Sequence, residues 1–314
     1  MPWHHCWRYI QSEPGAANTY KARKQHMVRL EFSTELSYDV GEPGADFIFN
    51  VQLAHTPRQA VVTESLQLTQ NVPSSQYTNP VTRSRFLRLQ AEAGPFTLRY
   101  TAVVDLIHYE AQPDQLPELS PQALPGEVLP YLYPSRYCQS DRLLMVASQE
   151  FGHLPPGYSR AKAICDWVGR HVTFQGNTSS STTSAVDTLI ERVGVCRDFA
   201  HLMIALCRAA NLPARMASGM DYGADPALGP PDFHAYVEVF LGDRWYMFDP
   251  SGTAIPMGFV RFATGRDAAD IAFATIFGNV SSAQPIIHIQ ALPNAQGQLV
   301  VPRHVGYALS TDGP

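Results

Sequence analysis

The sequence predicts an α+β protein in which an N-terminal β-sandwich precedes a domain of helices packed on an antiparallel sheet. Three observations support this prediction. Residues 27–110 contain short runs of β-branched and aromatic residues separated by turn-like clusters. Residues 111–139 are rich in proline. Beyond them the apolar spacing becomes helical and then returns to that of strands. The 314 residues suit two domains.

The first domain is expected to span residues 27–110. Five strand-like runs carry the pattern, and clusters such as GEPGA and NVPSSQYTNP separate them: VRLEFSTEL, DFIFNVQLA, AVVTESLQLTQ, SRFLRLQAEA and FTLRYTAVVDLIHYE. Strands at this spacing favour an antiparallel sandwich. The domain has no cluster of histidine, cysteine or acidic residues, so we expect a structural or docking role.

Residues 111–139 are predicted to form an extended linker between the domains. Proline lacks the backbone donor that interior helix and sheet positions need. Six prolines fall within 22 residues of this segment: Pro113, Pro117, Pro121, Pro125, Pro130 and Pro134.

The second domain is expected to span residues 140–314. A helical stripe runs from Ala161 to Val172, and Thr183 or Ser184 can cap a short helix after it. The clearest helix begins near Cys196 and stops before Pro213. FHAYVEVFLGDRWYMFDP then reads as a hairpin that turns at Gly242-Asp243.

Composition and charge indicate which classes of partner are not expected. The chain is 45% hydrophobic and carries a formal net charge of −5. Domains that grip phosphate backbones usually show basic excess, so we expect no nucleic-acid partner. No apolar run approaches the ~18 residues of a membrane helix, so we expect no membrane partner. Residues 1–26 lack the apolar core of a secretory signal and are predicted to be a disordered tail, with Met27 as an alternative start.

The cysteines point to a reducing environment. There are five, an odd and scattered set that makes a poor disulfide framework: Cys6, Cys138, Cys165, Cys196 and Cys207. Together with the absence of a signal, they predict a cytoplasmic location. Cys165 and Cys207 lie in apolar helical patterns and are interpreted as buried packing residues. His4-His5-Cys6 has no fourth ligand in sight, so we expect neither a metal nor another cofactor.

Cys196 lies where a loop after Gly194-Val195 becomes a helix. The first amides of a helix have no partner within it, and the aligned peptide dipoles add partial positive charge there. Both effects stabilise a thiolate, and the same amides can hold an oxyanion. Arg197 adds positive charge. A cysteine alone at this position would more often be structural, so the hypothesis needs a base.

His234 and Asp249 supply the base and its orienting acid. They lie on successive strands of the predicted hairpin. A two-residue turn at Gly242-Asp243 places His234 opposite Ser251 and Asp249 opposite Tyr236, so His234 and Asp249 are diagonal neighbours on one face. A carboxylate there can fix the imidazole tautomer. Taken singly, each residue would more often be structural.

These segments resemble a known family. TTSAVDTLIERVGVCRDFAHLMIALCRAANLPARMASGM and DFHAYVEVFLGDRWYMFDPS resemble the nucleophile, histidine and aspartate segments of bacterial transglutaminase-like proteins, and RFATGRDAADIAF resembles the end of the same domain. The resemblance spans 159–277 and extends to a preceding β-sandwich. It implies a papain-like core in which Cys196, His234 and Asp249 form a catalytic triad. Tyr236 stands where many members have tryptophan.

The expected chemistry is acyl transfer from an amide through a thioester. We favour hydrolysis of a peptide or isopeptide-like amide in a peptide or protein substrate. Glutamine–lysine cross-linking is the alternative within this chemistry, and a non-catalytic binding module on the same fold is the alternative outside it.

Other polar residues near the motif receive weaker assignments. Gln175 and Trp167 are both candidates for a side-chain oxyanion donor, and the sequence does not choose between them. Asp198 and His201 could line the cleft, although structural roles are favoured. The acids and arginine of GRDAAD, namely Arg266, Asp267 and Asp270, are expected to fix a loop.

Overall fold

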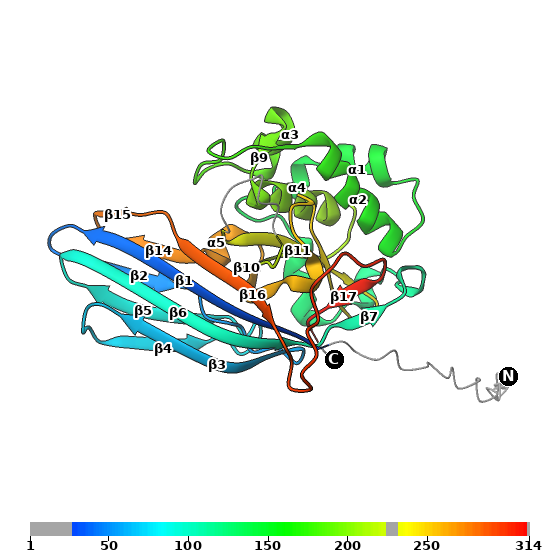
Figure 1. Ribbon diagram of the computed structural model, residues 1–314. Coiled ribbons are helices and arrows are strands. Elements are labelled where there is room, and N and C mark those ends of the chain that lie inside the picture. The colour runs from blue at the N-terminus through cyan, green and yellow to red at the C-terminus, as the bar shows by residue number, and fades with distance from the viewer. Residues whose placement is uncertain (1–26, 224–231, 313–314) are drawn as a thin grey trace, which may run out of the picture.

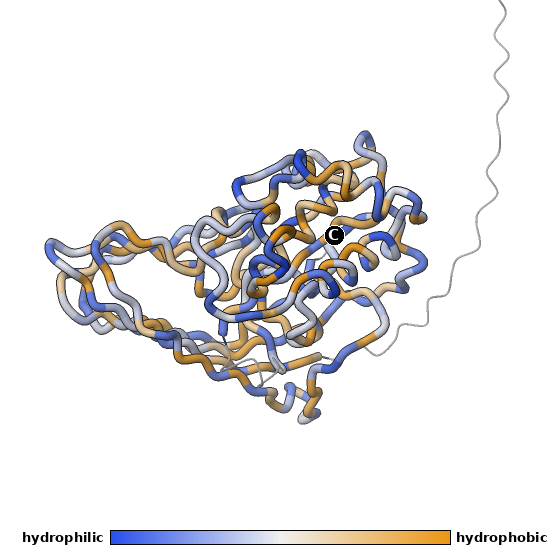
Figure 2. Tube along the Cα trace, turned by 90° about the horizontal axis from the view of Figure 1, so that it is seen from above, coloured by the Kyte–Doolittle hydropathy of each residue, from blue (hydrophilic) through white to orange (hydrophobic). Residues whose placement is uncertain are grey.

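The computed structural model describes residues 27–223 and 232–312. The expected N-terminal tail and the His4-His5-Cys6 cluster therefore lie outside the described residues. A β-sandwich extends from one side of a four-stranded sheet, and helices cover the other side (Figure 1). Seen from above, the sandwich projects well beyond the helical part (Figure 2). In the described part of the chain, no helix has the length and apolar character needed to span a membrane.

The sandwich consists of two antiparallel sheets. One has the order β15-β1-β6-β3, with β16 also on β1, and the other has the order β14-β2-β5-β4. The N-terminal strands are β1 (Val28–Val40), β2 (Ala45–Phe49), β3 (Gln59–Leu68), β4 (Ser74–Thr78), β5 (Arg85–Ala91) and β6 (Gly94–Leu106). In β1 every second residue is buried, as the alternating pattern requires.

Aromatic side chains fill the space between the two sheets. Tyr38 of β1 packs on Phe47 of β2 at 5.1 Å between ring centroids, and Phe47 contacts Phe96 of β6 at 5.4 Å. All three are at most 7% exposed. The predicted sandwich is therefore present, and burial of these rings holds its sheets together.

Three C-terminal strands complete the sandwich: β14 (Ala274–Phe277), β15 (Val280–Ser282) and β16 (Ile286–Leu292). β14 pairs with β2, and the other two pair with β1. The prediction that residues 140–314 form one separate domain is thus wrong for 274–292. Without these strands β1 and β2 would each leave an unpaired edge, which their pairing removes.

The proline-rich segment is not an extended linker. It forms the short 3-10 turns η1 (Pro113–Gln115), η2 (Pro121–Ala123) and η3 (Gly126–Leu132), and η4 (Ser140–Arg142) follows. Leu124, Val128 and Tyr131 pack against Phe240 and Trp245 of the hairpin. Proline fixes φ at a value that suits such turns, so the segment packs without regular backbone pairing.

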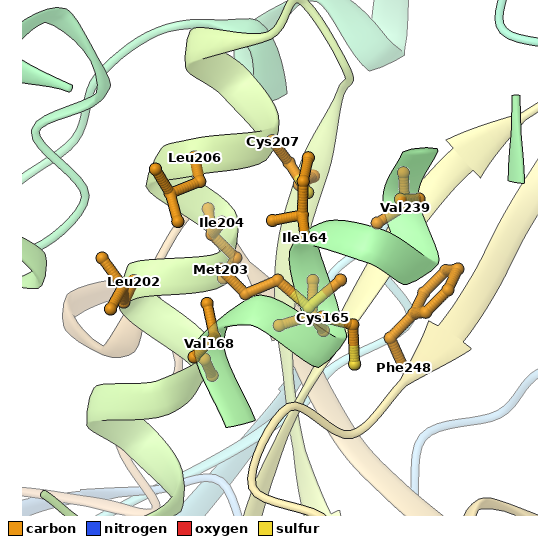
Figure 3. Close-up of a cluster of buried hydrophobic side chains, with 14 of the residues drawn as sticks. Ile164, Cys165, Val168, Leu202, Met203, Ile204, Leu206, Cys207, Val239 and Phe248 are labelled. Atoms are coloured by element: carbon orange, nitrogen blue, oxygen red, sulfur yellow. The ribbon is translucent and has the colours of Figure 1, made fainter. Parts of the chain in front are cut away.

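Helix α4 (Cys196–Ala209) is the centre of the second part. It is buried continuously from Asp198 to Arg208. The helices α1 (Leu144–Phe151), α2 (Tyr158–His171) and α3 (Ala185–Glu191) surround it. Figure 3 shows Ile164, Cys165 and Val168 of α2 packed beside Met203 of α4, with Val239 and Phe248 from the sheet nearby.

The sheet beneath α4, called here the core sheet, has the order β12-β11-β10-β13. Its strands are β10 (Ala214–Met220), β11 (His234–Leu241), β12 (Arg244–Phe248) and β13 (Val260–Gly265). Its second face joins the sandwich core: Tyr236 stacks on Phe259 at 3.8 Å and is fully buried. The core sheet is thus covered on both faces, which explains why every residue of its strands except Ser218 is buried.

Two short strand pairs and a short helix complete the fold. β7 (Tyr109–Ala111) pairs with β17 (Ala308–Ser310), and β8 (Thr173–Phe174) pairs in parallel with β9 (Val193–Gly194). The turn η6 (Pro256–Gly258) precedes β13, and the helix α5 (Ala268–Ile271) follows β13.

A buried charge cluster ties the C-terminal segment to the core sheet. Arg215 donates to Glu238 at 2.7 Å and also binds Asp312, while Arg261 binds Asp312 at 2.7 Å. The Gln59 side chain reaches from the sandwich to the backbone of Arg261. Two guanidinium groups and two carboxylates therefore neutralise one another where the sandwich, the core sheet and the C-terminal segment meet.

Asp312→Asn should lower the free energy of unfolding at pH 7 by about 3 kcal/mol, because two buried arginines then share one carboxylate. Although burial raises the pKa of Asp312, Arg261 and then Arg215 hold it well below its usual range. The stabilisation is complete above about pH 4, the unfolded value, and is lost as pH falls towards the folded one. Urea unfolding from pH 7 to pH 3 should show the difference between wild type and variant shrinking below about pH 4.

The matched control is Asp166→Asn, which breaks the Lys162–Asp166 pair, whose side chains are 50% and 43% exposed. It should cost at most about 1 kcal/mol. The assigned role of the cluster would be contradicted if both variants lost the same free energy of unfolding. It would also be contradicted if the loss in Asp312→Asn did not depend on pH.

Candidate active site

Cys196 is the first residue of α4, and its neighbours fix where that helix begins. Asp198 accepts the Val195 backbone N–H through Oδ2 at 2.9 Å and the Ser179 hydroxyl through Oδ1 at 2.8 Å. A Cβ at Gly194 would lie 2.7 Å from Cβ of Asp198, so glycine is needed there. Asp198 therefore has the structural role expected of it: it holds the strand-to-helix junction that presents Cys196.

The Cys196 side chain lies against the beginning of β11. Its Sγ is 4.0 Å from the carbonyl oxygen of Phe233. Burial raises the pKa of the thiol to about 12, and hydrogen bonds with the Ala235 and Arg197 backbone act in the opposite direction. Phe233 and Ala235 are the residues on either side of His234. The Cys196 sulfur therefore lies level with His234 along β11.

Two carboxylates hold the His234 ring. Nε2 is 3.4 Å from Oδ1 of Asp249, and Nδ1 is 3.1 Å from Oδ2 of Asp221. Burial lowers the pKa of His234, but the charges of Asp249 and then Asp221 outweigh it, and the pKa lies above its ordinary value. The ring also packs against Phe259 at 5.2 Å between centroids.

Asp249 is fixed by the turn that it begins. Its Oδ1 accepts the Ser251 hydroxyl at 2.6 Å and the Ser251 backbone N–H at 3.0 Å, and its Oδ2 accepts the Ala254 backbone N–H at 2.9 Å. Burial raises the pKa of Asp249, whereas His234 and these donors lower it, with a net lowering. The residue thus starts a turn and also orients the imidazole.

The hairpin register agrees with the prediction. Val237 pairs with Phe248 and Leu241 with Arg244, which is the register of a two-residue turn at Gly242-Asp243. Continued to the strand ends, this register makes His234 and Asp249 diagonal neighbours, in agreement with their 3.4 Å contact.

In the part of the chain described, Cys196 forms no hydrogen bond with a ring nitrogen of His234; its sulfur contacts the Phe233 carbonyl. Asp221, which the sequence interpretation did not single out, occupies Nδ1 instead. A signal was present: Asp221 follows β10 directly, and β10 is the neighbour of β11 on the side away from β12. An acid just after the end of β10 therefore lies close to His234, the first residue of β11.

The two oxyanion candidates have different surroundings. Trp167 donates Nε1 to Glu150 at 3.1 Å and stacks on His171 at 3.7 Å within the helical core. Gln175 has an exposed side chain, and its backbone N–H binds the Gly194 carbonyl at 2.9 Å. Gln175 therefore lies on the loop beside the start of α4, whereas Trp167 is engaged elsewhere.

The remaining polar residues hold loops. His201 is buried, stacks on Tyr137 at 5.0 Å and accepts the Ala268 backbone N–H, and burial lowers its pKa to about 3. Asp267 caps α5 through the Ala269 backbone N–H, and Arg266 pairs with Asp270. Arg197 binds the carbonyl of Ser180 at 2.6 Å. These contacts position the segments around Cys196.

The other described cysteines are packing residues. Cys138, Cys165 and Cys207 are free and at most 6% exposed, whereas Cys196 is partly exposed. Burial raises the pKa of Cys138 and of Cys165 to about 12, and that of Cys207 further. Cys165 also lines a cavity of about 280 Å³ with Asp249.

The sequence matches the transglutaminase-like superfamily over residues 146–250 and the bacterial transglutaminase N-terminal domain over residues 28–119. A solved structure from Cytophaga hutchinsonii, described as a candidate cysteine protease, is 39% identical, covers 91% of this chain and 98% of that one, and superposes with a TM-score of 0.83.

Two mycobacterial relatives match a shorter stretch. An uncharacterized protein of Mycobacterium leprae is 29% identical over 35% of this chain, and one of Mycobacterium tuberculosis is 30% identical over 32%. The match spans only 41% and 35% of the length of those relatives. The near full-length similarity to the Cytophaga structure, together with both family matches, shows that the chain belongs to the transglutaminase-like superfamily.

Proposed function

We propose that this protein transfers acyl groups from amides through a thioester on Cys196, with hydrolysis of a peptide or isopeptide-like amide as the overall reaction. The observation that carries the proposal is the placement of the Cys196 thiol at the His234 position of β11, with Asp249 bound to that histidine. A nucleophile at a helix start, a base and an orienting acid are the parts that such chemistry needs.

The proposed reaction begins from the neutral His234 ring, to which the Cys196 proton moves, forming a thiolate and an imidazolium. The sulfur then attacks the amide carbonyl carbon, and the imidazolium returns the proton to the leaving amine as the carbon–nitrogen bond breaks. Water, deprotonated by His234, attacks the thioester and releases the acid and the thiol. Asp249 stabilises the imidazolium throughout.

The oxyanion of each tetrahedral intermediate would be held at the start of α4. The first backbone amides of that helix have no partner within it and point outwards. Gln175 is proposed as the additional side-chain donor, because it is exposed on the loop paired with Gly194 while Trp167 is bound to Glu150.

Hydrolysis is favoured over transfer to an amine because the Cytophaga structure, 39% identical over nearly its whole length, is described as a candidate cysteine protease. Both outcomes use the same thioester and differ in whether water or an amine attacks it. An activated ester such as p-nitrophenyl acetate separates the steps: the p-nitrophenol burst reports acylation, and the steady rate reports deacylation. Product masses with and without an added primary amine then distinguish acid from amide.

Cys196→Ala should abolish the burst, because the other described thiols are buried. In the wild type, alkylation by iodoacetamide followed by peptide mass mapping should modify Cys196 at least about tenfold faster than Cys165 or Cys207. Cys165→Ala and Cys207→Ala are the matched controls, since both remove buried thiols of the helical core. They should lower stability by about 1–3 kcal/mol and keep the burst. Faster labelling of Cys165 or Cys207 would identify a different nucleophile.

His234→Ala should reduce acylation nearly as much as Cys196→Ala, because a nucleophile and its base act as a unit. Asp249→Asn should be milder, with a loss of up to about 10⁴-fold, since the imidazole keeps its place but loses the charge that stabilises its protonated form. Burst rates across pH measure both effects, and circular dichroism checks folding. A folded His234→Ala variant with wild-type acylation would refute the proposed base.

A further inference from the structure

Asp221 places a second carboxylate on the ring of His234, on the nitrogen that does not face Asp249. The Nδ1–Oδ2 distance is 3.1 Å, and the two side chains are 7% and 3% exposed. Gly219 pairs with His234 across β10 and β11. A Cβ at Gly219 would come within 1.9 Å of the Val260 carbonyl oxygen, so glycine is needed where β10 shifts register against β13. This irregularity lies two residues before Asp221.

The distance implies that a proton lies between His234 and Asp221. A ring nitrogen and a carboxylate oxygen at 3.1 Å would repel each other if both presented only lone pairs. Nε2 uses a second proton for its contact with Asp249. The ring is therefore an imidazolium, or Asp221 itself is protonated. In the first case Nδ1 already carries a proton, and in the second it accepts the Asp221 hydroxyl, so in neither case is Nδ1 free to accept the Cys196 proton while the contact with Asp221 persists.

The titratable groups that the described residues place around this ring are acids and a thiol. Asp221 comes from the end of β10, Asp249 from the end of β12 and Asp232 from just before β11, while Cys196 comes from the start of α4. Behind Asp249, Cys165 of α2 is the next titratable neighbour. On the β13 side the ring meets uncharged Phe259. One imidazolium thus faces more negative charge than it can neutralise.

We propose that Asp221 is a positioning residue that holds Nδ1 of His234 away from Cys196 in the resting protein and sets the pH at which the thiol becomes reactive. This inference rests on the proposed function, because it assigns His234 as the partner of Cys196. Asp221 competes with the thiolate for the same ring nitrogen. Ionising Cys196 while both aspartates are charged adds a further negative charge to a buried site, which costs free energy.

Removal of the Asp221 charge should make the thiol reactive at lower pH. In Asp221→Asn, Nδ1 is no longer held by a carboxylate and can turn towards the thiol, so the thiolate forms more readily beside it. The midpoint of the pH profile for Cys196 alkylation should fall by about one pH unit, the lower end of the range for one nearby charge. At a pH below both midpoints this shift corresponds to alkylation about tenfold faster than in the wild type.

The experiment measures the rate of iodoacetamide labelling of the Cys196 peptide from pH 6 to pH 11 in the wild type, Asp221→Asn and Asp232→Asn, so that a lower midpoint appears as faster labelling at every pH below it. Asp232→Asn is the matched control, because its carboxylate acts on Cys196 and His234 through charge but belongs to an exposed residue that does not contact the ring. Its midpoint should move by less than half as much. A second measurement, ¹⁵N NMR of the His234 imidazole in the wild type, should show both ring nitrogens protonated near pH 7.

The outcomes separate the two proposals. If Cys196 is not the fast-reacting thiol in the wild type, the proposed function fails. If Cys196 reacts fast but Asp221→Asn leaves the midpoint unchanged or moves it upwards, only the role of Asp221 is overturned. Should Asp221→Asn not fold, the NMR measurement decides alone: an unprotonated Nδ1 near pH 7, with Asp221 not itself carrying the proton by its carboxyl ¹³C shift, would overturn the inference.

Discussion

The burial of α4 from Asp198 to Arg208 is the constraint on which the rest of the structure depends. Helices pack on one side of it and the core sheet on the other, so its position and axis are fixed on every side. Its first turn nevertheless reaches the surface, and Asp198 with Gly194 sets the residue at which it begins. A partly exposed cysteine can therefore be held rigidly, because the ten or so residues behind it cannot move.

The sequence predicts much of this site because its geometry is local. The hairpin turn fixes the register, and the register brings His234 and Asp249 together without reference to any distant contact. The start of α4 is equally local, since glycine, the cap position and the apolar spacing lie within a few residues. Helix α2 is predicted for the same reason, and its stripe from Ala161 to Val172 is buried.

The parts that sequence patterns miss depend on contacts between distant segments. Strands β14 and β15 have only four and three residues, and β16 has one buried residue, Ile287, so their alternation is weak. Only the open edges of β1 and β2 explain why they form. Asp221 was missed for a similar reason: its role follows from the pairing of β10 with β11, not from any motif around it.

The return of the C-terminal strands to the sandwich has a consequence for synthesis on the ribosome. β1 and β2 emerge early, but each lacks a neighbour on one edge until residues 274–292 have been translated. The first-made lobe is therefore incomplete throughout elongation, with open strand edges that invite pairing with other chains. The nascent sandwich cannot close until residues 274–292 have been made, so its folding is expected to come late in synthesis.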